Sequence, residues 1–195
     1  MTIGKLQCTR TPFFVREIGM TVLIRRELTS DRDAIYVVNQ AAFGGDTEAR
    51  LVDELRAGGF VTVSLVAEID GQVAGYVLFS RAKISTATGS VDAIALGPMA
   101  VSPGFQRQRI GSKLLSVGLV ACRAHGHRIA VVLGHPEFYR RFGFCPELAQ
   151  RLESPFGKGK AWMAFELIPR ALEDIEGRVE FSSPFGLFEC GDRPG

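Results

Sequence analysis

The chain has 195 residues, of which 46% are hydrophobic and 23% are charged, and its formal net charge is +2. This length favours one domain with a sizeable core. The small net charge argues against a dedicated nucleic-acid binder, which carries a basic stripe, and no apolar run approaches the ~20 residues that cross a bilayer. We therefore expect no nucleic-acid partner and no membrane association.

The cysteines are scattered and lack the Cys-x-x-Cys spacing of a zinc site; they are Cys8, Cys122, Cys145 and Cys190. The first residues lack the apolar segment of a secretory signal. We therefore expect reduced thiols, a cytoplasmic location and no metal. Residues 1–19 carry no clear period, and we interpret them as an N-terminal extension, either disordered or an artefact of the choice of start site.

Helix and strand signals then follow one another in the first half of the chain. The pattern predicts a strand at 22–26, a helix from Thr29 or Ser30 to Gly44, a helix at 48–56, and strands at 63–69 and 73–80. Asp70-Gly71 between the last two is typical of a two-residue hairpin turn. The polar stretch 83–89 is expected to be a connection.

A strand-like run at 91–101 leads into the most informative stretch of the chain. Its Gly97-Pro98 pair does not suit a central ladder because proline lacks the N–H, so we predict a bulge or a splay there. A turn at 102–104 follows, and an amphipathic helix begins at about Ile110 and ends near Gly126. The first N–H groups of a helix have no internal partner and favour an anion, and Gly111 would let a ligand approach the backbone.

The rest of the chain predicts short elements. They are a buried strand at 129–133, a short helix from Pro136 to Phe142 capped by Gly143, a loop at 157–160, a strand at 162–167 and a last strand at 179–182.

Two motifs resemble the GNAT superfamily of acyl-CoA-dependent N-acetyltransferases. The run Gln106-Arg107-Gln108-Arg109-Ile110-Gly111 resembles its motif A, with Arg109 in place of the first glycine, and the run from Leu133 to Phe144, with Tyr139 before Phe142-Gly143-Phe144, resembles its motif B. The resemblance covers about 23–167. It implies a mixed α/β (α+β) fold with a mostly antiparallel sheet, one splayed parallel pair and helices on both faces. We expect a domain at 20–170 and a C-terminal strand and tail at 171–195.

The resemblance also implies acetyl-CoA as a cosubstrate and a primary amine as acceptor, joined by direct attack in a ternary complex. The residues expected to bind the cosubstrate are Met99, Ala100, Val101, Gln106, Arg107, Gln108, Arg109, Ile110, Gly111 and Ser112. The amides of 108–112 would hold the diphosphate, and the amide of Met99 or Ala100 would polarise the thioester carbonyl. Tyr139 would act as the general acid that protonates the departing thiolate. If the position of Arg109 requires a positive φ, arginine is strained there.

Several alternatives stay open at this point. The general base is not identified; Glu68, Asp92, Glu137, His135 and a water chain are all candidates. His125, His127 and His135 do not form a convincing metal trio. A non-catalytic CoA-binding or regulatory module is the alternative function. The acceptor is unidentified, its pocket is expected to be built by the first two helices, 81–90 and 145–161, and a homodimer is left open.

Overall fold

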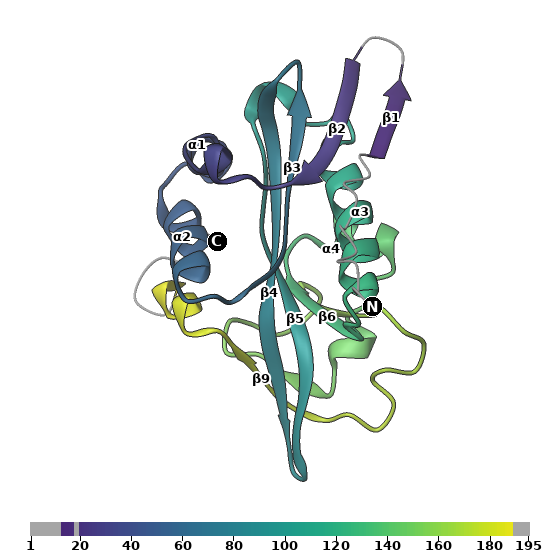
Figure 1. Cartoon of the computed structure of the whole chain (residues 1–195). Coiled ribbons are helices and arrows are strands. Elements are labelled where there is room, and N and C mark those ends of the chain that lie inside the picture. Colours follow the sequence, from purple (N-terminus) through teal and green to yellow (C-terminus); the bar gives the residue numbers. More distant parts are fainter. Residues whose placement is uncertain (1–12, 18–19, 189–195) are drawn as a thin grey trace, which may run out of the picture.

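The computed structural model describes residues 13–17 and 20–188 (Figure 1). Its strands are β1 (Phe13–Glu17), β2 (Met20–Arg26), β3 (Val61–Ile69), β4 (Gln72–Thr86), β5 (Gly89–Val101), β6 (Ile129–Leu133), β7 (Leu152–Glu153), β8 (Trp162–Glu166) and β9 (Gly177–Phe181). Its helices are α1 (Arg32–Phe43), α2 (Thr47–Ala57), α3 (Ile110–Ala124) and α4 (Pro136–Tyr139), with short 3-10 turns that include η3 (Arg140–Phe142) and η5 (Ser183–Phe188). Within the described part of the chain, no helix has the length and apolar character that crossing a membrane requires.

The strands form one sheet in the order β1-β2-β3-β4-β5-β6-β8. Neighbours along this path are antiparallel except β5 and β6, which are parallel. Strand β9 pairs antiparallel with the far half of β4 and parallel with the short β7. The predicted mixed, mostly antiparallel sheet with a parallel pair is confirmed.

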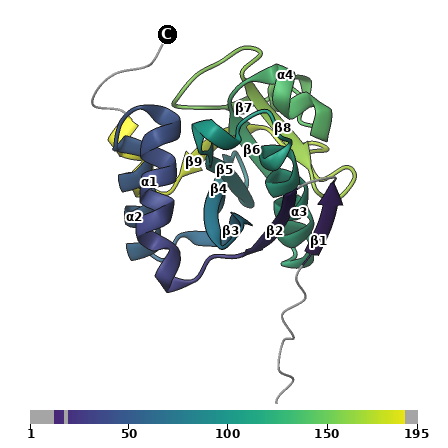
Figure 2. The same cartoon turned by 90° about the horizontal axis from the view of Figure 1, so that it is seen from above.

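Helices cover both faces of the sheet: α1 and α2 lie on one side and α3 on the other (Figures 1 and 2). Beneath α1 and α2, one apolar cluster joins Ile35 and Leu55 to Leu78 and Ala100 of the sheet. On the other face α3 approaches β4 closely, since a Cβ on Gly118 would lie 2.4 Å from the ring of Phe79. Helices on both faces, as predicted, are confirmed.

Strand β5 contains the predicted irregularity. Phe79 of β4 pairs with Leu96 and Val77 pairs with Met99, so the two residues Gly97 and Pro98 stand opposite the single residue Leu78. This two-against-one count is a β-bulge. The predicted bulge is therefore confirmed.

The parallel pair separates next to this bulge. Strands β5 and β6 are paired at Ile94 with Ala130 and at Ala95 with Val131, and their pairing then ends although both strands continue. The strand ends at Met99–Val101 and Val132–Leu133 are therefore not paired with each other, as the predicted splay requires.

Two expectations about the elements need correction. Residues 83–89 are not a loose connection, because β4 runs to Thr86 and β5 starts at Gly89. Ala82 and Ile84 are buried while Lys83 is exposed, and this alternation is that of a strand with one covered face. Within the predicted extension 1–19, residues 13–17 form β1 and pair with the edge of β2. The sequence Phe13-Phe14-Val15 has high β-propensity, and an edge strand has unpaired N–H and C=O groups that a further strand can bind. The expectation for 1–12 and 18–19 lies outside the described residues, and the division at residues 19 and 170 stays a prediction.

Candidate active site

The loop before α3 has an unusual backbone. Arg107 and Arg109 both have positive φ, +61° and +59°, and Arg109 is the N-cap residue of α3. The first bond of the helix runs from the Lys113 N–H to the Arg109 carbonyl at 3.0 Å. The N–H groups of residues 110–112 therefore precede the first helical bond, and together with the left-handed residues they form a concave set of donors suited to an anion.

Two glutamines hold this loop in shape. The Gln106 side chain donates to the carbonyl of Val101 at 3.0 Å, and the Gln108 side chain donates to the carbonyl of Gly104 at 3.2 Å. Both amides are turned back onto the loop. These contacts indicate that the two side chains shape the loop and that a ligand would meet the backbone and the arginines.

The end of β5 presents alternate N–H groups to opposite sides. The Ser102 N–H donates to the carbonyl of Ala74 on β4 at 2.9 Å. N–H groups alternate along a strand, so the N–H of Ala100 also points at β4. The N–H groups of Met99 and Val101 then point the other way, toward the gap that opens beside β6.

Tyr139 lies at the end of α4, next to the end of β6. A Cβ on Gly134 would lie 2.5 Å from the Tyr139 ring, so this glycine is needed for the close approach. The ring packs edge-on against Phe138 and Phe144, at centroid distances of 5.1 and 5.7 Å. Burial raises the pKa of Tyr139 to about 12. The phenol keeps its proton at neutral pH, as an ordinary tyrosine does, and holds it more strongly.

The three elements meet around Gly111. A Cβ built there would lie 3.7 Å from Phe138 and Val101 and 4.0 Å from Met99. The start of α3, the end of β5 and α4 are thus in contact. A Cβ at Gly111 would meet these side chains at ordinary packing distances, and the role given above to this glycine, the approach of a ligand to the backbone, stays a prediction.

The base candidates are spread over several elements. Glu68 forms an ion pair with Arg25, with Oε2 2.7 Å from Nε. Asp92 lies opposite Lys83, and its seven residues from Met99 amount to roughly 20 Å along the strand. Glu137 and His135 flank Pro136 at the start of α4 and are exposed. Among the described residues, no group of three or more His, Cys, Asp or Glu side chains is placed to hold a metal ion.

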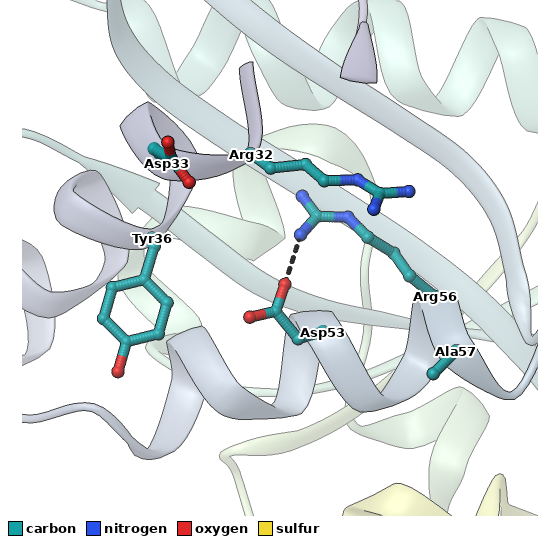
Figure 3. A pocket seen from close by; sticks show the side chains of 6 residues that line it. All are labelled: Arg32, Asp33, Tyr36, Asp53, Arg56 and Ala57. Atoms are coloured by element: carbon teal, nitrogen blue, oxygen red, sulfur yellow. Dashed lines mark hydrogen bonds and ion pairs between the residues drawn. The ribbon is translucent and has the colours of Figure 1, made fainter. Parts of the chain in front are cut away.

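A hollow of about 400 Å³ between α1 and α2 lies apart from this cluster. It is lined by Arg32, Asp33, Tyr36, Asp53, Arg56 and Ala57 (Figure 3).

The charge of Arg56 in this hollow is already balanced, since Nη1 lies 2.6 Å from Asp53 and Nε lies 2.7 Å from Glu27. Glu27 also accepts hydrogen bonds from the hydroxyls of Ser64 and Tyr76. Sequence reasoning missed this ionic network because its members come from α2, β3, β4 and the segment after β2, which are distant in sequence. We read it as a structural link between α2 and the sheet and assign it no step in the chemistry.

Sequence reasoning also missed Arg141. Its guanidinium donates to the Ser112 hydroxyl at 3.1 Å, across 29 residues of sequence. The signal available was its place two residues after Tyr139, inside the second motif.

Known proteins share this architecture. A model of the acetyltransferase (GNAT) domain matches residues 61–146. The curated protein YhbS of Escherichia coli K12, described as an uncharacterized N-acetyltransferase, is 36% identical over 172 residues, which are 86% of this chain and 100% of that protein.

Two crystal structures extend the comparison. YhbS from Escherichia coli in complex with CoA superposes with a TM-score of 0.80 and 31% identity, over 88% of this chain and 96% of that one. A GNAT family acetyltransferase from Brucella melitensis in complex with acetyl-CoA superposes with a TM-score of 0.70 and 34% identity, over 84% of this chain and 97% of that one. The family match, the identity over nearly the whole chain and the shared fold agree: this chain belongs to the GNAT family of N-acetyltransferases.

Proposed function

We propose that this protein transfers the acetyl group of acetyl-CoA to a primary amine, within a complex that holds both substrates. The observation that carries the proposal is the opening of β5 away from β6 beside the donor-rich start of α3, with Tyr139 at the edge of the same opening. The complexes of two relatives, at 31% and 34% identity, with CoA and acetyl-CoA support the identity of the cosubstrate.

The residues present fit such a molecule. The N–H groups of 110–112 and the backbone of the two left-handed arginines suit a diphosphate, and the Arg107 and Arg109 side chains supply positive charge. The separated strand ends leave backbone groups available for an extended chain that carries amides of its own. Met99, Ala100 and Val101 would contact this part of the cosubstrate.

Met99 is the better candidate for the donor to the thioester carbonyl. The alternation set by the bond from Ser102 to Ala74 directs the Ala100 N–H at β4 and the Met99 N–H at the gap. A donor aimed at the oxygen on which charge develops lowers the barrier to attack. The structure thus favours one of the two amides that the sequence left open.

Tyr139 then acts as the proton donor. The neutral amine attacks the carbonyl carbon of the thioester, the C–S bond breaks, and the Tyr139 hydroxyl gives its proton to the departing sulfur. The proton that the nitrogen loses on acylation restores the phenol, so the products are an amide and a free thiol. The phenol is protonated before the step at neutral pH, and its raised pKa extends this state to higher pH.

The test is thiol release from acetyl-CoA with a panel of primary amines, using the wild type and Tyr139→Phe. Loss of a general acid predicts a fall in kcat of about 10²–10³-fold, and calorimetry should show unchanged CoA affinity. A wild type that binds CoA but turns over no amine supports the non-catalytic binding module in its place. A variant as fast as the wild type would exclude Tyr139 as the proton donor.

A further inference from the structure

Arg141 is held beside the start of α3 by contacts on two sides. It donates from Nη2 to the Ser112 hydroxyl, and its guanidinium carbon lies 5.5 Å from the ring centre of Phe138 and 5.7 Å from that of Phe142. Two aromatic rings and one hydroxyl thus fix the position of an otherwise exposed, flexible side chain. Such an arrangement lowers the entropy that the side chain loses on binding a ligand.

The charge of Arg141 is not neutralised by the part of the chain that the structure describes. Its fixed hydrogen-bond partner is a hydroxyl, and no carboxylate of the described residues forms an ion pair with it. A fork of guanidinium donors matches an oxyanion well. Ser112, which it touches, also contributes one of the N–H groups that precede the first helical bond of α3.

We propose that Arg141 is a binding and specificity residue that contacts the diphosphate of the acyl carrier, so that the protein prefers carriers with a diphosphate to bare pantetheine thioesters. The inference rests on the proposed function, since it needs the diphosphate at the start of α3. Arg141 acts there together with the N–H groups of 110–112, and its guanidinium replaces one contact to solvent with one to phosphate oxygen.

Arg141 also lies on the same helical segment as the proposed proton donor. Residues 136–142 form one continuous helical segment, with the proton donor Tyr139 and Arg141 two residues apart on it. A diphosphate held by both α3 and Arg141 would tie this segment to α3. Binding at the phosphate end would thus help to hold the phenol in place at the thioester end.

The experiment compares Arg141→Gln, Arg141→Lys and the matched control Arg140→Gln with the wild type. Arg140 is the exposed neighbour on the same turn. Calorimetry measures the affinity of each protein for CoA and for 3′-dephospho-CoA, and acetyl transfer is followed with acetyl-CoA and with S-acetylpantetheine, which lacks phosphate. Melting curves verify that each variant is folded.

We expect Arg141→Gln to weaken CoA and 3′-dephospho-CoA by the same factor, about tenfold or more. In Arg141→Gln, transfer from acetyl-CoA should fall by a larger factor than transfer from S-acetylpantetheine; Arg141→Lys should be intermediate, and Arg140→Gln should be close to the wild type.

Unchanged CoA affinity in Arg141→Gln would overturn the inference, and so would a loss limited to CoA, which would assign Arg141 to the 3′-phosphate. An equal loss in Arg140→Gln would attribute the effect to general charge and overturn it too. A wild type that binds no CoA would overturn the proposed function itself, so the two failures are distinguishable.

Discussion

Replacing Arg109 by glycine would separate the backbone cost of this residue from the value of its charge. Arg109 has φ +59° and ψ +10°, a left-handed conformation that costs a residue with a Cβ roughly 1–2 kcal/mol. Glycine avoids that cost, but its greater freedom in the unfolded chain removes about 0.5–1 kcal/mol of stability. The net expectation is that Arg109→Gly stabilises the protein by roughly 0.5–1 kcal/mol, a rise in Tm of about 1–4 °C.

The matched control is the same substitution at Arg50, an exposed residue within α2. There the backbone is helical, and glycine should cost about 1 kcal/mol and lower Tm. The two arginine-to-glycine changes should therefore shift thermal unfolding in opposite directions, which calorimetry or circular dichroism can measure.

In Arg109→Gly the affinity for CoA should fall while the stability rises. Arg109→Gly removes a cation from the proposed diphosphate site and should weaken binding a few-fold, or about 1 kcal/mol. Arg109→Lys keeps both charge and strain and should resemble the wild type in both measurements. If Arg109→Gly lowers Tm as much as Arg50→Gly, the strain argument is refuted; if it binds CoA as tightly as the wild type, the charge argument is refuted.

Two further predictions concern Tyr139. Gly134→Ala places a Cβ 2.5 Å from the Tyr139 ring. This overpacking should lower stability by about 1–3 kcal/mol and displace the phenol, so that kcat falls. The control Gly45→Ala places its Cβ in open space and should change neither stability nor kcat. The second prediction is a pH profile. Because the pKa of Tyr139 is raised to about 12, about 1% of the phenol is ionised at pH 10, and kcat should not fall up to that pH; a descending limb centred near pH 10 that disappears in Tyr139→Phe would contradict this.

Much of the fold could be predicted because its signals are local. Asp70-Gly71 between two β-rich runs predicted the β3–β4 hairpin, and Pro98, which lacks an N–H, predicted the irregularity in β5. The amphipathic helix α3 and the cap at Gly143 were likewise predicted from patterns that span only a few residues. Tyr139 was singled out from the second motif, and its role stays a prediction.

What the tertiary structure decided involves residues that are distant in sequence. The extension of β4 and β5 over 83–89 depends on the cover that β9 and its neighbours give to Ile84. The choice between the Met99 and Ala100 amides depends on the register with β4. The strain at Arg109 is a backbone angle that its residue type does not reveal, and the contact of Arg141 with Ser112 exists because folding brings η3 against α3. Composition and short-range patterns determine where elements form, whereas pairing register, backbone angles and long-range contacts are set by the packing of the whole chain.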